Sequence, residues 1–371
     1  MKSLDAITEQ QRPISYGIVQ TGPNVMNGIP CLRVLDINDG KINRSDLITT
    51  SKQISDAYKR TVLKEGDLVM PLRGKVGDVG IIDRGLEGAN LTRGVALIAV
   101  QSAWSAPFFR QLISWSATRR RLEQTMNGSA LQEIPIASLR SFKVGMPPSL
   151  SEQRAIATVL SDVDALLDAL ERFIAKKRDF KQATMQQLLT SQTRLPGFHG
   201  EWEVKRLGDI LTVRHGKSQH EIIASDGRYP ILASGGEIGR TNNFIYDKPS
   251  VLIGRKGTID SPQYVDSPFW TVDTLFFTEI ADEADAKFVF YKFTMIRWRS
   301  YNEASGVPSL NAKTIENIEI PIPRLPEQTA IATVLSDMDA ELAALEQRLA
   351  KTRALKQGMM QELLTGRTRL V

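Results

Sequence analysis

A long internal repeat is the feature that most limits how this chain can fold. The segment Glu152–Leu195 aligns without a gap with Glu327–Leu370 at an offset of 175 residues, and 29 of the 44 aligned positions are identical. Solenoid proteins repeat every 20 to 50 residues or so, which makes two copies at this distance a different kind of repeat. They indicate a duplicated unit in which a variable block precedes a nearly constant block.

Both constant blocks are predicted to be long amphipathic helices, because their apolar residues recur at the steps of three and four that are typical of a heptad seam. These residues are Leu160, Val163, Leu167, Leu170 and Ile174 in the first copy and Leu335, Met338, Leu342, Leu345 and Leu349 in the second. Ser149 with Glu152 suits a capping box, and Pro326 suits a first helical turn. The alternative is two unrelated helices, each packed on its own domain. Identity at exposed as well as apolar positions favours a shared partner surface.

The order of the blocks favours an antiparallel pair of helices. Residues 196–326 leave the end of the first helix and return to the start of the second. In an antiparallel pair these two points are adjacent, whereas in a parallel pair the block must bridge a rod of about 60 Å. We therefore expect a coiled coil with pseudo-twofold symmetry, formed through the ten apolar residues named above.

The two variable blocks, residues 1–150 and 196–326, share one plan although their residues differ. Each mixes short β-branched runs with Gly, Asn and Asp turns, which predicts strands and loops. Each contains one predicted helix, Phe108–Gln124 or Phe288–Asn302, and ends in a Gly-containing segment, a strand and a proline. The expected fold class is α+β, with two mixed α/β domains joined by two long antiparallel coiled-coil helices at residues 151–195 and 327–371.

One turn in each variable block places basic residues beside glycine, as Arg73-Gly74-Lys75 and as Arg255-Lys256-Gly257. Glycine lets the backbone approach a surface closely, and arginine binds guanine O6 and N7 in the major groove. Other candidates for DNA binding are Arg33, Lys41, Arg44, Arg93, Arg214, Lys217, Arg240 and Asn242. The alternative for each residue is a solvated surface charge. The paired turns and the net charge of +5 favour a polyanionic partner.

The patterns that would indicate catalysis or cofactor binding are incomplete. Gly216-Lys217-Ser218 lacks the upstream glycine of a phosphate-binding loop, because Leu211 occupies that position. Three histidines and one cysteine supply neither a disulfide nor a zinc ligand set. We expect no catalytic residue, no metal and no cofactor. The chain has no apolar run of membrane-spanning length and no secretory signal, so a cytoplasmic protein is expected.

The order of variable block, constant helix, variable block and constant helix resembles the specificity subunit of type I restriction–modification enzymes. The resemblance covers essentially the whole chain, and its most specific element is the duplicated EQ-x-AIA-x-x-L-x-x-x-D motif at Glu152–Asp164 and Glu327–Asp339. It implies two target recognition domains that bind a bipartite, asymmetric site in double-stranded DNA. It also implies two methyltransferase subunits and ATP-driven restriction subunits as partners, which would carry the chemistry.

Two points stay open at this stage. The second variable block opens with GFHGEWEVKRLGDI, a segment common in the family, whereas the first opens with MKSLDAITEQQ, so the first domain could be packed differently at its edge. The alternatives in function are a specificity subunit of a methyltransferase-only or type IIB-like system, a fused restriction–modification enzyme, and a coiled-coil scaffold without a nucleic-acid role.

Overall fold

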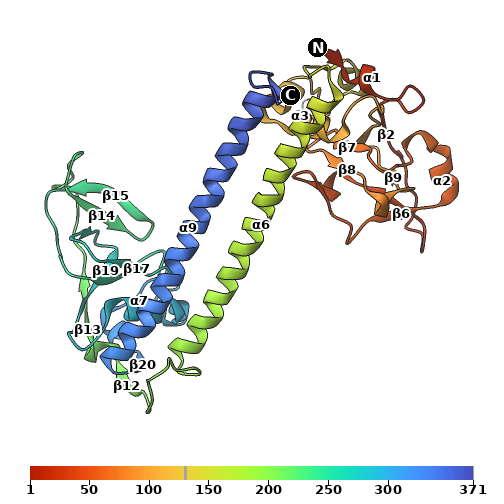
Figure 1. The fold of residues 1–371 in the computed structure, drawn as a ribbon. Coiled ribbons are helices and arrows are strands. Elements are labelled where there is room, and N and C mark those ends of the chain that lie inside the picture. Colours follow the sequence, from red (N-terminus) through yellow and green to blue (C-terminus); the bar gives the residue numbers. More distant parts are fainter. Residues whose placement is uncertain (129–131, 371) are drawn as a thin grey trace. The chain divides into compact units, whose positions relative to one another are not determined.

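The computed structural model describes residues 1–128 and 132–370, and the chain divides into two compact units. Unit 1 comprises Met1–Glu171 and Arg348–Val371, and unit 2 comprises Arg172–Gln347. Each unit therefore consists of one variable block and about half of each long helix (Figure 1). Within the described ranges, no helix is both long and apolar enough to cross a membrane.

The two constant blocks form the helices α6 (Leu150–Leu189) and α9 (Leu325–Leu364), each of 40 residues. Both helices stop before the end of the repeated segment. Beyond their last turns the backbone enters the left-handed region, at Ser191 with φ 59° and at the equivalent Gly366 with φ 74°. Long helices in both copies were predicted and are confirmed, but the predicted ends were too late by about two turns.

The two helices run antiparallel in both units. In unit 1, Asp164 and Glu171 of α6 pair with Lys356 and Arg353 of α9, so the partner's number falls as the α6 number rises. In unit 2 the same trend holds for the ion pairs Lys177–Glu341 and Lys181–Asp339. The ten apolar residues of the predicted seam are all buried or half-buried.

Each unit contains a four-stranded antiparallel sheet with the same strand order. In unit 1 the order is β2 (Ser15–Tyr16), β10 (Val95–Ile98), β7 (Leu68–Pro71) and β8 (Gly80–Ile81). In unit 2 it is β13 (Leu211–His215), β19 (Leu275–Ile280), β16 (Ser250–Gly254) and β17 (Gln263–Val265). The shared plan of the variable blocks is therefore present in the fold.

A three-stranded sheet also occurs in each unit, with one antiparallel and one parallel pairing. Its strands are β6 (Ile48–Thr50), β3 (Ile29–Leu32) and β9 (Asn90–Leu91) in unit 1. They are β15 (Gly236–Thr241), β14 (Tyr229–Ala233) and β18 (Trp270–Thr271) in unit 2. In both units the strand that comes last in the sequence pairs parallel with the middle strand, β9 with β3 and β18 with β14.

The largest difference between the units lies in the connection between the first two strands of this sheet. In unit 1, residues 33–47 join β3 to β6 and contain the 3-10 helix η1 (Val34–Asp36) and the hairpin β4 (Ile37–Asn38) and β5 (Lys41–Ile42). In unit 2, only Ser234 and Gly235 join β14 to β15. We call residues 33–47 the unit 1 insertion.

The edge of each domain is closed in the same way. Strand β1 (Lys2–Ser3) pairs antiparallel with β11 (Lys143–Val144), as β12 (Glu203–Arg206) pairs with β20 (Glu319–Ile322). The first domain is thus packed at its edge like the second, over two residue pairs in place of four.

The single helix predicted in each variable block is wrong in detail, because each is interrupted. In unit 1, α3 (Ala106–Ser114) and α4 (Ser116–Glu123) are separated by Trp115, whose backbone is extended. In unit 2, α7 (Ala286–Met295) is followed by the 3-10 helix η5 (Trp298–Tyr301). Trp298 is buried, and its Nε1–H donates to the Phe293 carbonyl oxygen at 2.8 Å, which closes the end of α7.

The remaining helices are short. They are α1 (Leu4–Ile7), α2 (Lys52–Ala57), α5 (Ile136–Ser141), α8 (Ala312–Glu316), η2 (Lys59–Thr61), η3 (Arg84–Leu86) and η4 (Leu207–Asp209). The main core of each unit contains side chains from both long helices, such as Leu160 and Leu363 in unit 1 and Leu188 and Leu335 in unit 2. Each variable block is therefore built onto both helices.

Candidate nucleic-acid interface

The glutamine of the repeated motif anchors each variable block to a long helix. Gln153 accepts a hydrogen bond from the backbone N–H of Ser105 at 3.1 Å, and Gln328 accepts one from Asp285 at 2.9 Å. Ser105 and Asp285 are the N-caps of α3 and α7. Both glutamines are buried, so each fixes the start of a domain helix against the coiled coil.

The glutamate of the motif is held by an arginine from the other copy of the repeat. Glu152 near the start of α6 binds Arg369 beyond the end of α9, and Glu327 of α9 binds Arg194 beyond the end of α6, each through both carboxylate oxygens. The carboxylates are almost fully buried, at 2% and 4% exposure. Ser149 does cap the Glu152 N–H at 3.5 Å, but the Glu152 carboxylate is used in the ion pair, which leaves the predicted capping box half formed.

The aspartate that ends the motif joins three elements. Asp164 contacts Lys356 of α9 at 2.5 Å and accepts a hydrogen bond from Gln111 of α3 at 2.7 Å. The equivalent Asp339 pairs with Lys181 of α6 and accepts from the Tyr291 hydroxyl of α7 at 2.7 Å. Burial, together with the nearby carboxylate, raises the pKa of Tyr291. The constant residues thus hold the two helices and the domain helix together.

The two basic turns are structurally equivalent, but the first arginine of one turn does not match the first arginine of the other. The backbone N–H of Leu72 donates to the Gly94 carbonyl oxygen, in the segment between β9 and β10. The backbone N–H of Arg255 donates to the Thr274 carbonyl oxygen, in the segment between β18 and β19, and both distances are 2.9 Å. Arg73 therefore matches Lys256, while Arg255 occupies the position of a buried leucine. Each matched residue precedes a glycine in the left-handed region, Gly74 at φ 71° and Gly257 at φ 83°.

The cations Arg73, Lys75 and Arg93 lie along one edge of unit 1. The Arg73 guanidinium lies over the backbone at Gly94. A Cβ atom added to this glycine would be 3.4 Å from the Arg73 Nε. Arg93 immediately precedes that glycine, and the Lys75 ammonium donates to Asn38 of the unit 1 insertion. We call these three residues the basic edge of unit 1.

The cations Lys217, Arg255 and Lys256 lie around the same strand connection in unit 2, where Lys256 is the one that matches a cation of unit 1, Arg73. The backbone N–H of Lys217 donates to the Thr271 carbonyl oxygen at 2.9 Å. The Arg255 side chain donates through Nη1–H to the Asp273 carbonyl oxygen at 3.2 Å. Lys256 is exposed at the turn itself. We call these three residues the basic edge of unit 2.

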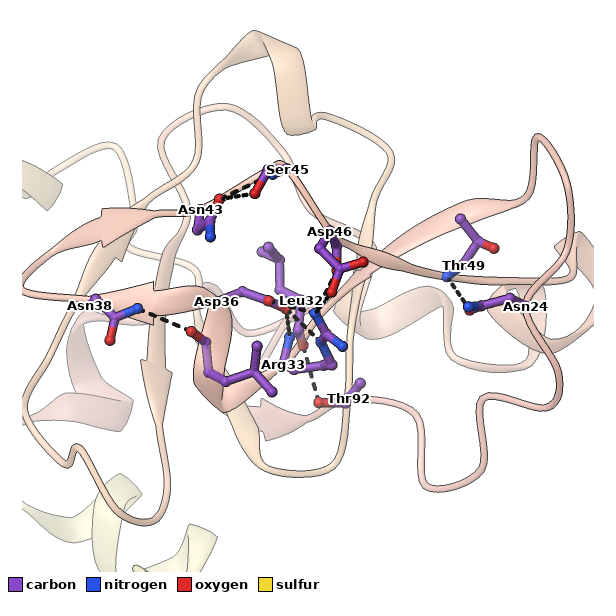
Figure 2. Close-up of polar contacts among 11 residues, drawn as sticks. Asn24, Leu32, Arg33, Asp36, Asn38, Asn43, Ser45, Asp46, Thr49 and Thr92 are labelled. Atoms are coloured by element: carbon purple, nitrogen blue, oxygen red, sulfur yellow. Dashed lines mark hydrogen bonds and ion pairs between the residues drawn. The ribbon is translucent and has the colours of Figure 1, made fainter.

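Three other basic residues predicted in unit 1 are bound to acidic groups of their own domain. Arg33 binds the Asp36 carboxylate through two nitrogens and donates to the Asp46 carbonyl (Figure 2). The hydrogen bond that Arg33 donates to the Asp36 carboxylate raises the pKa of Arg33. Arg44 pairs with Asp83 and lowers the pKa of that carboxyl group. Lys41 pairs with Asp168 on α6 at 2.6 Å.

The remaining candidates in unit 2 also have partners within the unit. Arg214 pairs with Glu279 at 2.8 Å, and that contact raises the pKa of Arg214. Arg240 binds Glu237 and donates to the carbonyls of Gly227 and Arg228, and Asn242 accepts from the Arg228 N–H at 3.2 Å. These pairings were not visible in the sequence, because most partners are far away along the chain. The two basic edges are the groups that the structure brings together.

A cleft of about 810 Å³ lies in unit 1, between the insertion, α3 and the two long helices. Its charged lining residues pair with one another, as in Lys41–Asp168, Lys356–Asp164 and Arg353–Glu171. Among the residues placed in the structure, no cluster of His, Cys, Asp and Glu could hold a metal ion. The Lys41–Asp168 ion pair thus ties the insertion to α6 across this cleft.

Comparison with known proteins places the chain in a family. The family model described as "Type I restriction modification DNA specificity domain" matches residues 22–177 and 199–352. The chain is 31% identical over 170 residues to the type I restriction enzyme EcoBI specificity subunit of Escherichia coli, which covers 46% of this chain and 35% of that protein. It is 24% identical over 380 residues to the putative type I restriction enzyme MjaX specificity subunit of Methanocaldococcus jannaschii, covering 92% of this chain and 88% of that protein.

A solved structure shows the same fold. The S subunit of a type I restriction–modification system from M. genitalium superposes with a TM-score of 0.66 and 17% sequence identity, over 98% of this chain and 95% of that one. The family model matches the chain twice, once for each variable block with its helix. The chain belongs to the family of type I restriction–modification specificity subunits.

Proposed function

We propose that the chain is a non-catalytic DNA-binding subunit that selects a bipartite, asymmetric site in double-stranded DNA. The observation that carries this proposal is the pair of equivalent basic turns, with Arg73 in unit 1 and Lys256 in unit 2, which belong to two domains of the same fold but differ in sequence. Equivalent placement favours a common ligand, and different residues favour different target sequences. Each unit would then read one half of the site.

The chemistry of the basic edges fits duplex DNA. Lysine and arginine bound to phosphates supply affinity that falls with salt, and contacts to base edges supply sequence discrimination. Residues such as Arg33 and Arg240, which are bound to groups of their own domain, would instead keep the loops in shape. We therefore assign recognition to Arg73, Lys75 and Arg93 in unit 1 and to the basic edge of unit 2.

The subunit would act with partners that carry the reactions. We propose that two methyltransferase subunits, and restriction subunits where cleavage occurs, assemble with it on DNA in the cytoplasm. The family relationship supports these partners, and the sequence patterns for catalysis are incomplete. The duplicated helices support two equivalent methyltransferase positions, because a repeated surface presents the same residues twice.

The test is the methylated motif of host DNA, read by sequencing with the wild-type gene and with variants. We expect Arg73→Ala to relax or weaken one half-site and Lys256→Ala the other, because the two turns lie in different units. Losing a base contact of this kind typically costs about 1–3 kcal/mol of discrimination. Arg84→Ala is the matched control, since this arginine is 86% exposed and lies outside the basic edge.

Gel shifts of the reconstituted complex at low and moderate salt complete the test. Binding that weakens steeply with salt and prefers the methylated motif supports the proposal. A complex that shows no preference for that motif, or variants that leave both half-sites unchanged, would contradict it. The chain would then be a scaffold for its partners.

A further inference from the structure

The unit 1 insertion, which unit 2 lacks, begins with a hydrogen-bonded turn. Arg33 donates its backbone N–H to Asp36 Oδ2 at 2.7 Å and its Nη2–H to Oδ1 at 2.9 Å, which closes the 3-10 turn on itself. Asn38 donates to the Leu35 carbonyl at 3.0 Å, so the turn is also tied to the following hairpin. The backbone on both sides of Leu35 is thereby held in place.

This hydrogen-bonded turn presents an apolar side chain to solvent. Leu35 is 60% exposed, whereas Asp36 beside it is buried. Its other neighbour, Val34, packs against the backbone at Gly94, where an added Cβ would lie 2.8 Å from Val34 Cγ2. A single exposed leucine is ordinary on a protein surface, so its surroundings decide its meaning.

The residues on either side of Leu35 contact the basic edge of unit 1. Val34 and Arg73 cover the same glycine, Arg93 precedes that glycine, and Lys75 is bound to Asn38, which in turn holds Leu35. Arg73 and Arg93 form no ion pair with a carboxylate in the described part of the chain, unlike Arg33 and Arg44. This part of unit 1 thus has an exposed apolar side chain, Leu35, whose neighbours reach cations that have no carboxylate partner in the described chain.

We propose that Leu35 is a specificity residue of unit 1 that packs against the 5-methyl group of a thymine in the major groove. This inference rests on the proposed DNA-binding function. The basic edge that the neighbours of Leu35 contact suits a polyanion, and the thymine methyl is the apolar group that a base pair presents in the major groove. The corresponding connection in unit 2 is the short turn Ser234–Gly235, so this contact belongs to one half-site alone.

The experiment uses the reconstituted complex with its methyltransferase subunits and DNA duplexes that carry the methylated motif. Each thymine of the motif is replaced in turn by uracil, which removes only the 5-methyl group. We expect one substitution, in the half-site that Arg73→Ala affects, to weaken wild-type binding about three- to fivefold, the effect of losing one buried methyl group. Leu35→Ala should weaken binding to the thymine duplex and show no further loss with uracil at that position.

Two further variants keep the result interpretable. Leu35→Met retains an apolar side chain and should keep the sensitivity to uracil. Val204→Ala is the control, because Val204 is 67% exposed on β12 in the other unit, and it should keep the whole wild-type pattern.

The inference is overturned if Leu35→Ala retains every uracil sensitivity of the wild type, or if no thymine of the motif responds to uracil. Failure of the proposed function gives a different result. In that case the wild-type complex does not distinguish the motif from a scrambled duplex at all.

Discussion

Lys292 is a buried lysine that caps the end of a long helix. It is 7% exposed, and its ammonium donates to the carbonyl of Leu189, the last residue of α6, at 2.9 Å. The same ammonium lies 5.5 Å from the ring centre of Trp202 and 6.0 Å from that of Phe288. These contacts favour the charged form, but burial opposes it more strongly and lowers the pKa of Lys292 to about 8.

The stability of the chain should therefore depend on pH through Lys292. Between pH 8 and the ordinary lysine pKa of 10.5, the folded chain has released this proton while the unfolded chain still holds it. The unfolded state then binds more protons, so the free energy of unfolding rises with pH. We expect the wild type to gain up to about 2 kcal/mol relative to Lys292→Met between pH 8 and pH 10, measured by urea unfolding.

The comparison with Lys292→Met removes the contribution of other titrating groups. Burial raises the pKa of Cys31 to about 11, which makes stability fall with rising pH above the ordinary cysteine value, but it does so equally in both proteins. A difference between wild type and variant that stays constant from pH 8 to pH 10 would show that Lys292 remains charged in the folded chain.

The ion pairs of single basic residues could not be predicted from the sequence. Arg33 and Arg73 are both arginines next to strands, yet Arg33 is bound by Asp36 and Asp46 while Arg73 is free of carboxylates in the described structure. The partner of Lys41 is Asp168, which is 127 residues away, so no local pattern reveals it. The matching of Arg73 with Lys256 depends on strand register, which two short and diverged blocks do not encode locally.

At the scale of elements, the repeat explains why the two helical segments stay alike. Several constant residues of one copy pair with constant residues of the other, as Glu327 of α9 pairs with Arg194 beyond α6. A change in one copy therefore removes the partner of a residue in the other. Length and heptad periodicity made α6 and α9 predictable over most of their extent. The break at Trp115 between α3 and α4 was not predictable, because tertiary packing decides it and the segment has a continuous helical pattern.

The Arg194–Glu327 pair should be a strong structural contact. Glu327 is 4% exposed, and Arg194 also donates to the carbonyls of His199 and Gly200. Arg194→Ala leaves a buried carboxylate without a partner, which typically costs about 3–5 kcal/mol. We expect a loss of this size in the free energy of unfolding, followed by tryptophan fluorescence in urea.

Two companion variants separate the buried charge from lost packing. Arg194→Ala combined with Glu327→Gln should recover part of the loss, because the unpaired charge is gone. Arg178→Ala removes an exposed ion pair with Glu346 and should cost less than about 1 kcal/mol. Equal losses of unfolding free energy in Arg194→Ala and Arg178→Ala would mean that the buried pair stabilises the fold no more than the exposed pair does.

At the scale of the whole molecule, two units of one architecture share two continuous helices. Each unit has its own core and its own set of anchors, at Glu152, Gln153 and Asp164 in unit 1 and at the equivalent residues in unit 2. The segments between these anchors contain no residue of either basic edge. Under the proposed function, their length would set the number of base pairs between the half-sites.

Shortening both helices by one heptad tests this idea. The deletion removes residues 170–176 from α6 and the equivalent residues 345–351 from α9, which keeps the heptad seam in register. Seven residues correspond to about 10 Å of helix, or about three base pairs of duplex. We expect sequencing of methylated host DNA to show both half-sites unchanged and a shorter spacer. A matched deletion of four residues, about one helical turn, should likewise change the spacer and keep the half-sites. A deletion that alters the half-sites and keeps the spacer would refute the role of the helices in spacing.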